Sequence, residues 1–491
     1  MVDTLQQRAA RGAVFISGLS LFQRLVTLPA SIVLARVLTP TDYGIYGIVS
    51  FIVTFFTTFS NVGFGAALIQ QSEPPSREDL TTTFTVQMAL VCGMTAIGFV
   101  IAEPVSQAYQ LSEEGVWLIR VLLLSLPLSL LRTIPALLLE RELLFGRVSI
   151  IEAVETFSFY GTAVALSLLN FGTWSFIWAT VVRGALGVGV ALVLSPWRPG
   201  LGFSRSVAER LIRFGLPYQL RLALTLLRDA LTPTVLGLLV GAAAVGYITW
   251  AFTFALLPVL LTGPLWRVMF PAISRAQNDP SLLKNMIERS LRLSAIVFFP
   301  LSFLMMGAAP EIVRYIYTEQ WAPALPAIYL FSVSIWPGAL LATLAFNVFN
   351  GMGHSKLALY LIILYGALDW LIGVPLVLWL GFNGIAIGAV LVAYIMVPVV
   401  VRVLKSIVTV SIISQTVRPF VTGACAALVE VGLLAVLPPG VISLAVSMSC
   451  AALVYIVVIA VWEQSILRIT LRRMLPLRFQ GLFRWYLAPQ D

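Results

Sequence analysis

The sequence predicts an all-α polytopic membrane protein with about 14 transmembrane helices. Apolar residues make up 59% of the 491 positions and charged residues only 11%, against roughly 45–50% and about 25% in soluble domains. The apolar residues also fall in runs of about 20, the length that an α-helix needs to cross a hydrocarbon core about 30 Å thick. The apolar excess is therefore expected to lie inside a membrane.

The predicted helices follow one another through most of the chain. Their approximate bounds are 12–35, 43–69, 82–102, 115–139, 149–170, 173–195, 214–240, 244–270, 291–313, 324–350, 357–380, 383–404, 418–437 and 441–462. Lys and Arg gather in the tails and in alternate loops, whereas the opposite loops hold only Arg36 and Arg314, with Arg120 near a helix end. By the positive-inside rule, we expect both termini to be cytoplasmic.

The connections between the predicted helices are short. None exceeds about 20 residues, which leaves no room for a soluble catalytic domain and weighs against an enzyme. The two longest cytoplasmic links carry apolar residues among charges and predict short helices in the membrane interface. The residues concerned are Val207, Leu211 and Phe214 in one link, and Leu282, Leu283 and Ile287 in the other.

Composition also argues against a metal site, a cofactor or a nucleic-acid partner. Cys92, Cys425 and Cys450 lie inside apolar runs, and no pair has the spacing of a zinc or redox motif. The net charge of +9 comes from basic residues in short loops, where they report membrane orientation. We therefore predict no cofactor, no metal and no nucleic acid.

An internal repeat divides most of the chain into two halves. The stretch Leu34 to Tyr46 returns in degraded form as Leu236 to Ile248, and the turn Asn170 to Trp174 has a counterpart in Gly381 to Ile385. Each half then contains six helices, and because six is even, both halves have the same orientation. This predicts a pseudo-twofold axis along the membrane normal and a central cavity between the halves.

The repeat leads to a predicted domain organisation of five segments. These are a first lobe at 1–195, a cytoplasmic linker at 196–213, a second lobe at 214–404, two additional helices at 405–462 and a basic cytoplasmic tail at 463–491.

Several charged residues lie inside the predicted helices. Arg24, Arg183 and Arg228 are near helix centres, and each would cost roughly 2.5–3.5 kcal/mol if it faced lipid. We expect these arginines to face the central cavity, together with the acidic residues Asp229 and Asp369. Further candidates are Arg132 and Arg221, which lie closer to cytoplasmic helix ends, and Glu430 in the thirteenth helix. Ion pairing within the bundle is the alternative for the three acidic residues, and snorkelling to the membrane interface is the alternative for Arg132 and Arg221.

A cavity lined mainly by arginine favours an anionic cargo. Guanidinium groups bind phosphate or diphosphate through two parallel hydrogen bonds. The same lining is unusual for a protein that exports cations or apolar drugs. The charges therefore predict a phosphate-bearing or diphosphate-bearing substrate.

The sequence resembles the multidrug/oligosaccharidyl-lipid/polysaccharide exporter superfamily, specifically its bacterial polysaccharide flippase branch. The resemblance covers the whole chain, and three stretches carry it in order: Leu34 to Tyr46, Arg213 to Pro217, and Phe270 to Arg275. It implies two lobes in a V shape, in a bacterial inner membrane. It also implies a flippase that moves an undecaprenyl-diphosphate-linked oligosaccharide from the cytoplasmic to the periplasmic leaflet by alternating access, for exopolysaccharide, capsule or O-antigen biosynthesis. A polysaccharide polymerase is a possible partner.

The resemblance also marks where this chain departs from its relatives. Arg24 matches the first-helix arginine of the related peptidoglycan-precursor flippases, but Ala30 stands where a second arginine is expected. This favours a glycan other than the peptidoglycan precursor. No sodium site or proton relay is visible, so the energy source stays open.

Two other functions compete with the flippase. A multidrug or cation antiporter of the same superfamily is expected to carry an acidic residue where this chain has Arg24. A membrane-embedded polysaccharide polymerase needs a substantial periplasmic loop and catalytic carboxylates, whereas Glu113 and Glu114 are the only acidic pair in the predicted periplasmic links.

The two additional helices are predicted to provide a path for the polyprenyl tail. Four small residues, Gly423, Ala424, Ala426 and Ala427, give the thirteenth helix a face that either permits close packing or leaves a groove.

Overall fold

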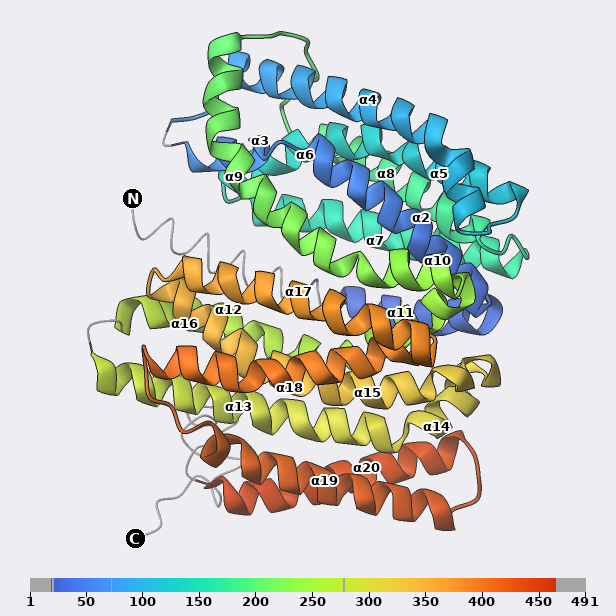
Figure 1. Cartoon of the computed structure of the whole chain (residues 1–491), viewed down its shortest axis with the longest axis vertical. Helices are drawn as coiled ribbons and strands as arrows, with labels where there is room; N and C mark the ends of the chain where they lie inside the picture. Colours follow the sequence, from blue (N-terminus) through green and yellow to red (C-terminus); the bar gives the residue numbers. More distant parts are fainter. Residues whose placement is uncertain (1–18, 20–21, 72, 277–278, 465–491) are drawn as a thin grey trace. The chain divides into compact units, whose positions relative to one another are not determined.

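The chain is helical throughout the described part of the computed structural model, which covers residues 19, 22–71, 73–276 and 279–464 (Figure 1). These residues contain no strand, and the predicted all-α class is confirmed. Eleven helices in this part of the chain are long and apolar enough to cross a membrane, and Ala242–Leu256 is a shorter apolar helix. Thirteen of the predicted transmembrane helices coincide with one or more observed helical segments. The first, 12–35, does so from residue 22 onward, and residues 12–18, 20 and 21 of it lie outside the described residues.

The helices follow each other with short connections. After a first helix at residues 22–37 come α2 (Pro40–Ser60), α3 (Phe64–Gln70), α4 (Arg77–Ala108), α5 (Glu113–Leu123), α6 (Ser125–Arg141), α7 (Phe145–Leu168) and α8 (Trp174–Leu194). The chain continues through α9 (Arg205–Asp229), η1 (Thr232–Leu236), α10 (Gly237–Leu239), α11 (Ala242–Leu256), α12 (Val259–Ala276), α13 (Pro280–Gly307), α14 (Ala309–Glu311), η2 (Ile312–Tyr317) and η3 (Glu319–Ala324). The last elements are α15 (Leu325–Pro337), η4 (Gly338–Ala342), α16 (Thr343–Gly351), α17 (Ser355–Leu380), α18 (Asn383–Lys405), α19 (Ile412–Val436) and α20 (Val441–Trp462).

Packing divides the chain into two compact units. Unit 1 comprises Met1–Trp250 with Asp369–Ile385, and unit 2 comprises Ala251–Leu368 with Ala386–Asp491. This division differs from the repeat-based lobes at 1–195 and 214–404, because α9, α10 and the end of α17 belong to unit 1. The five-segment organisation stays a prediction, and nearly all of the predicted tail at 463–491 lies outside the described residues.

The first repeated motif forms a capped turn between two helices. Thr39 is the N-cap of α2, and its side chain accepts a hydrogen bond from the Asp42 backbone N–H while Asp42 accepts from Thr39. Pro40 occupies the first turn, where its missing N–H costs nothing. Asp42 also accepts a hydrogen bond of 2.7 Å from Thr173 Oγ1 in the turn before α8. The motif therefore joins two helix connections at the same end of unit 1.

The two copies of the repeat contact each other through glycines. A Cβ atom on Gly44 of α2 would overlap the carbonyl of Ala242, and a Cβ atom on Gly246 of α11 would overlap the carbonyl of Pro40. Pro40 corresponds to Ala242 in the repeat, and Gly44 corresponds to Gly246. A reciprocal contact of this kind is what a local twofold axis between two equivalent segments produces. The predicted repeat is thus visible in the packing at this end of unit 1.

Some predicted helices are interrupted. The second predicted helix, 43–69, breaks after Ser60 and resumes as α3, because Gly63 adopts a left-handed conformation with φ of 77°. A Cβ atom on Gly63 would also overlap the backbone of Gly215 in α9. The seventh, 214–240, contains the π-helical turn η1. These breaks lie where backbones approach closely or where helical hydrogen bonding changes register.

The predicted interface helix in the first long link is continuous with the seventh transmembrane helix. Helix α9 begins at Arg205, so the two form one helix. Val207 and Leu211 are buried in a cluster with Phe64, Leu68 and Leu137. The link therefore holds helices α3, α6 and α9 together.

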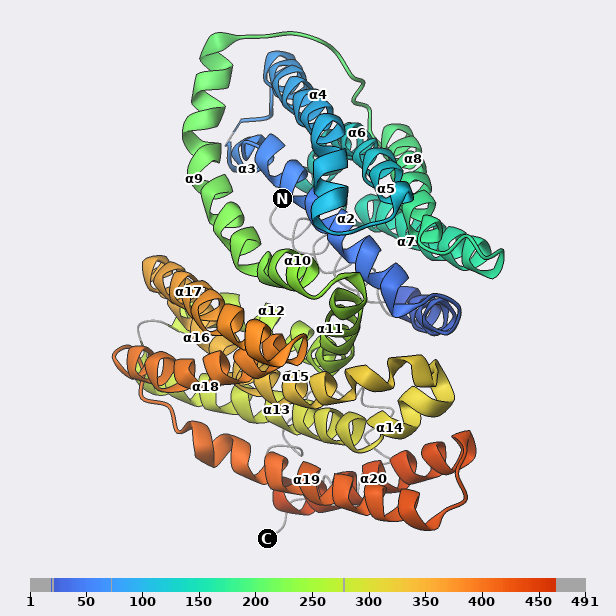
Figure 2. The same cartoon turned by 45° about the vertical axis from the view of Figure 1, so that its right-hand side comes forward.

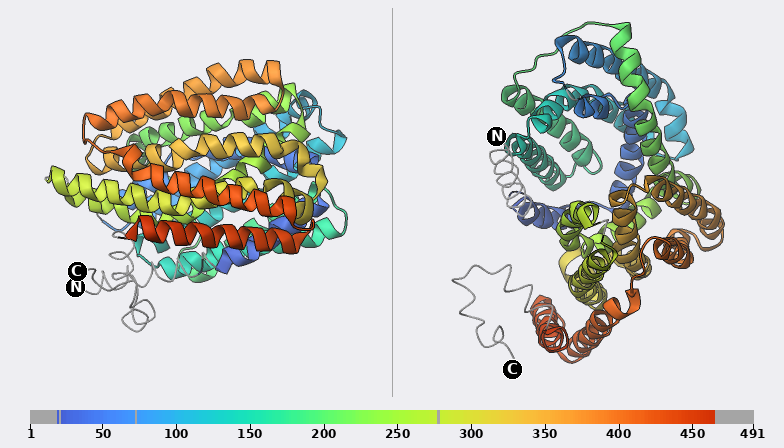
Figure 3. Two further views of the ribbon diagram at one scale, coloured as in Figure 1. Left: turned by 90° about the horizontal axis from the view of Figure 1, so that it is seen from below. Right: turned by 90° about the vertical axis from the view of Figure 1, so that its left-hand side faces the viewer.

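Unit 2 is centred on the long helix α13 (Figure 2). Helix α19 lies along α13 and pairs with α20 (Figure 3). Phe299 and Phe303 of α13 meet Phe420 of α19 and Trp336 of α15 at ring separations of 5.0–5.9 Å. Tyr455 of α20 donates a 2.7 Å hydrogen bond to the carbonyl of Ile296.

The small-residue face of α19 is used for packing. Gly423 and Ala426 are buried, and a Cβ atom on Gly423 would lie 3.1 Å from the Phe303 ring. Close approach of α13 fills the space that these small side chains leave. Gly423 and Ala426 therefore serve close helix packing, one of the two alternatives for this face, and the path for a polyprenyl tail along the two additional helices stays a prediction.

Candidate functional site in the membrane-spanning helices

The predicted site residues fall into three places. Arg132 and Arg183 belong to one cluster in unit 1, and Arg228, Asp229 and Asp369 belong to a second cluster in the same unit. Glu430 lies in unit 2. Arg24 lies in the first helix, and the side chain of Arg221 lies outside the described residues.

The first cluster contains a buried ion pair. Arg132 Nε of α6 lies 2.6 Å from Glu155 Oε1 of α7, and the Glu155 side chain is only 7% exposed. Helix α8 makes room for this carboxylate with Gly187, since a Cβ atom there would overlap Glu155 Oε1. Three helices thus position one carboxylate that sequence analysis did not select.

Arg183 adds a second positive charge to this cluster. It lies at the centre of α8 and is exposed, and its charge acts on Glu155. Among the described residues, its guanidinium has no ion-pair or hydrogen-bond partner. Glu152, three residues before Glu155 on α7, is a second carboxylate whose charge acts in this cluster. Glu155 pairs with Arg132, and the exposed Arg183 is the positive charge that an anion can reach.

Arg24 lies in the same part of unit 1. Phe22, two residues earlier, packs edge-on against Phe157 of α7 with ring centroids 5.7 Å apart, and α7 is the helix that carries Glu155. Arg24 is half-buried, and its guanidinium has no ion-pair or hydrogen-bond partner in the part of the chain that the structure describes.

The second cluster is less positive. Arg228 uses Nε and Nη2 to donate hydrogen bonds of 2.9 and 2.7 Å to Oδ1 of Asp229, its neighbour in the chain. Both charges also act on Asp369 of α17. Here one arginine faces two carboxylates, so Arg228 is paired, in contrast to the arginine-lined surface that the sequence predicts.

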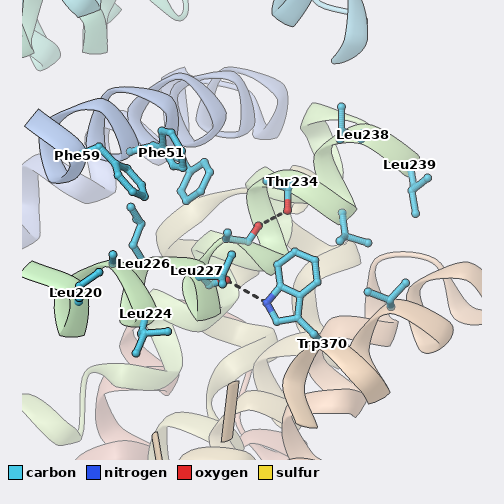
Figure 4. Close-up of a pocket in the computed structure, with 15 residues that line it drawn as sticks. Phe51, Phe59, Leu220, Leu224, Leu226, Leu227, Thr234, Leu238, Leu239 and Trp370 are labelled. Carbon is cyan, nitrogen blue, oxygen red and sulfur yellow. Dashed lines mark hydrogen bonds between the residues drawn. The ribbon is translucent and has the colours of Figure 1, made fainter. Parts of the chain in front are cut away.

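An apolar pocket adjoins the second cluster. Its volume is about 830 Å³, and its walls come from α2, α9, η1, α10 and the end of α17 (Figure 4). Trp370, the residue after Asp369, closes one side, and its indole Nε1 donates a 3.0 Å hydrogen bond to the carbonyl of Leu227. The pocket thus begins one residue away from Arg228 and from Asp369. The pocket is not recognisable from the sequence, because its walls consist mostly of Leu, Phe and Ala residues of the kind found throughout the apolar helices.

Glu430 belongs to a different environment. It is fully buried, neither oxygen has a hydrogen-bond partner among the described residues, and Oε2 would lie 2.7 Å from a Cβ atom on Gly307 of α13. Its side chain is packed between α19 and α13, so it faces a neighbouring helix.

Comparisons of sequence place the chain among polysaccharide biosynthesis proteins. The sequence profile described as "Polysaccharide biosynthesis protein" matches residues 33–326, more than half of the chain. The Succinoglycan biosynthesis transport protein ExoT of Rhizobium meliloti is 25% identical, with 91% of this chain and 90% of that protein covered. The Lipopolysaccharide biosynthesis protein WzxC of Escherichia coli is 24% identical, with 66% of this chain and 65% of that protein covered.

Solved structures share the fold. The lipid II flippase MurJ in an inward closed conformation matches with a TM-score of 0.75, at 12% identity, over 92% of this chain and 100% of that chain. An inward-facing multidrug resistance transporter of the MATE family matches with a TM-score of 0.61, at 16% identity, over 78% of this chain and 95% of that one. At these identities, the matches show that the chain shares the fold of the two proteins. The chain belongs to the polysaccharide biosynthesis protein family and is a multi-pass membrane protein whose relatives include a transport protein.

Proposed function

We propose that the chain is a flippase, and not an enzyme, that moves an undecaprenyl-diphosphate-linked oligosaccharide from the cytoplasmic to the periplasmic leaflet of a bacterial inner membrane. The names of two relatives support a role in exopolysaccharide or lipopolysaccharide biosynthesis. The shared fold with a lipid II flippase supports a lipid-linked cargo. A polysaccharide polymerase would then receive the translocated unit.

The observation that carries the proposal is Arg183 at the centre of α8, whose guanidinium has no ion-pair or hydrogen-bond partner among the residues that the structure describes. Arg183 lies beside an arginine that already occupies the only buried carboxylate of its cluster. An unpaired guanidinium at this depth is costly unless it meets water or an anion. A diphosphate offers several oxygens for charge-assisted hydrogen bonds, and Arg24 in the adjacent first helix adds a second donor group.

Alternating access requires that the two ends of the transport path open in turn. The glycine contact between the two repeat motifs holds one end of α2 against one end of α11. Small residues allow such helices to pack tightly and separate without unpairing polar groups. We propose that this contact is the closed periplasmic end, with both termini in the cytoplasm.

The proposal is tested by substituting the arginines in a strain that lacks the native gene. Arg24→Ala and Arg183→Ala should be inserted normally and should each lower glycan export roughly tenfold to 100-fold, because a charge-assisted contact is worth about 1.5–3 kcal/mol. Arg205→Ala is the control, since Arg205 is exposed and pairs only with Glu209 one turn away. Normal export by both Arg24→Ala and Arg183→Ala would refute a role for these arginines in substrate binding.

One observation favours a second function, an antiporter for lipophilic cations. The Arg228, Asp229 and Asp369 cluster contains more acid than base and adjoins an apolar pocket. This combination also suits a cation with a large apolar body. Uptake of a fluorescent lipophilic cation into vesicles distinguishes the two functions, because the flippase predicts no uptake beyond that of empty vesicles.

A further inference from the structure

The apolar pocket of unit 1 is a recess whose walls include four aromatic side chains. Phe51, Phe55 and Phe59 line it from α2, Leu224 and Leu227 from α9, and Trp370 from α17. The Trp370 indole N–H is already bonded to a backbone carbonyl, so it presents its apolar face to the recess (Figure 4). Water gains almost no hydrogen bonds in such a space, whereas a hydrocarbon chain fills it with favourable contacts.

The depth of the pocket in the membrane restricts its occupant. Its wall residues on α9, η1 and α10 run from Leu220 to Leu239 and so span the length of the apolar stretch Leu222–Leu239. Arg228 lies inside this stretch and is accessible, with 37% of its side chain exposed. The head group of a resident phospholipid stays at the membrane surface and does not reach a charge at this depth. A transported lipid is different, because its charged head group crosses this level.

We propose that the pocket binds the polyprenyl chain of the lipid carrier during translocation, with the diphosphate passing beside Arg228. This inference rests on the proposed flippase function and deepens it by assigning a site to the chain of the substrate. Two carboxylates offset the charge of Arg228, so the cluster holds a diphosphate weakly and the apolar walls supply the affinity. Weak binding of the head group suits a site that a substrate has to leave.

The structure also explains why the chain binds here and not along the small-residue face of α19. That face is filled by α13, with Gly423 and Ala426 buried. The pocket of unit 1 is open and empty of side chains over about 830 Å³. Apolar walls and an accessible charge, that of Arg228, therefore lie side by side at this pocket.

A photoreactive polyprenyl diphosphate tests the inference on the purified full-length chain in vesicles. The photoreactive group is placed on the hydrocarbon chain, and labelled peptides are identified by mass spectrometry. We expect labelling in the segments of α2, α9 and α17 that line the pocket. Leu224→Trp should fill the pocket and lower this labelling about tenfold.

Leu222→Trp provides a matched control. Leu222 lies on the same helix and is similarly exposed, at 38% against 41% for Leu224, but does not line the pocket. This variant should keep wild-type labelling. Uncharged polyprenol should compete with the probe nearly as well as the diphosphate does, because the walls and not the head group supply the affinity. Phosphatidylglycerol at the same concentration should not compete.

Several results would overturn the inference. Equal labelling of the two tryptophan variants, effective competition by phosphatidylglycerol, or displacement by a lipophilic cation but not by polyprenol would each contradict a polyprenyl site. Glycan export by the same chain shows whether only the pocket inference is wrong or the proposed flippase function is wrong as well. If the pocket stays unlabelled while other helices are labelled and export persists, only the pocket inference fails. If no part of the chain is labelled and the chain does not restore export, both fail.

Discussion

The arginines inside the helices differ in their surroundings, and we expect some of them to serve folding and others to serve transport. Arg132 is held by the buried carboxylate of Glu155, whereas Arg183 has no such partner among the described residues. A buried carboxylate that loses its cation is expensive. An unpaired arginine can be removed without that penalty.

Arg132→Ala should therefore lower the free energy of unfolding by about 3 kcal/mol. This value is at the low end for breaking a buried ion pair, because 30% of the Arg132 side chain is exposed to solvent. Arg183→Ala should leave stability nearly unchanged. Thermal unfolding of the purified protein in detergent checks both variants. The double substitution Arg132→Met with Glu155→Gln should recover most of the loss. A melting temperature for Arg183→Ala as low as that of Arg132→Ala would contradict this distinction.

The sequence identifies most of these residues but not their pairing. A mid-helix arginine is visible from sequence because apolar neighbours surround it, as at Arg24 and Arg183. Glu155 was missed because Arg147 and Glu152 precede it, so it reads as part of a polar cytoplasmic helix end. The partner of Arg132 lies on another helix, and pairing between helices depends on packing that a single sequence does not reveal. The pairing of Arg228 with Asp229 was more accessible, because the two residues are adjacent.

At the scale of elements, the repeat motif fixes how two helices cross. The two repeat copies share one spacing, Pro40 to Gly44 and Ala242 to Gly246, and each glycine lies against the backbone carbonyl of the other copy. Backbone atoms cannot move aside as a flexible side chain can. Any added methyl group has to separate the helices.

Gly44→Ala and Gly246→Ala should each weaken this crossing by about 1–3 kcal/mol, the usual cost of overpacking. Gly47→Ala is the control, because a Cβ atom there would meet only the Val245 side chain at an ordinary 3.5 Å. Cysteines introduced at Thr41 and Ala243 report the crossing through disulfide formation. We expect slower crosslinking in the first two variants and wild-type rates in Gly47→Ala. Unchanged crosslinking in all three would show that the crossing does not depend on glycine.

Helix positions were more predictable than helix interruptions. The apolar runs place all the predicted transmembrane helices, because hydrophobic length is set by the membrane and not by neighbouring helices. The break at Gly63 and the π-helical turn η1 arise where other backbones or side chains approach. The small-residue face of α19 was ambiguous for a similar reason, because small residues occur both where helices pack closely and where they leave a groove.

At the scale of the whole molecule, the orientation in the membrane follows from the basic loops. With both termini cytoplasmic, the turn that contains Thr41 should face the periplasm. A cysteine introduced at position 41 should react with a membrane-impermeant maleimide added to intact cells whose outer membrane has been made permeable. A cysteine introduced at Arg205 should react only after the inner membrane is disrupted. The reverse pattern would invert the topology and the direction of transport.

Lipid translocation by the purified protein distinguishes a flippase from a protein of the same fold that moves no lipid. Vesicles are prepared with a fluorescent undecaprenyl-diphosphate oligosaccharide in both leaflets, and a membrane-impermeant glycosidase is added outside. Without protein, about half of the lipid should be cleaved, because only the outer leaflet is accessible. With the wild-type chain, we predict that cleavage proceeds to completion, and that Arg183→Ala slows the second half roughly tenfold or more. Cleavage that stops at the protein-free level with wild-type protein would contradict the flippase account.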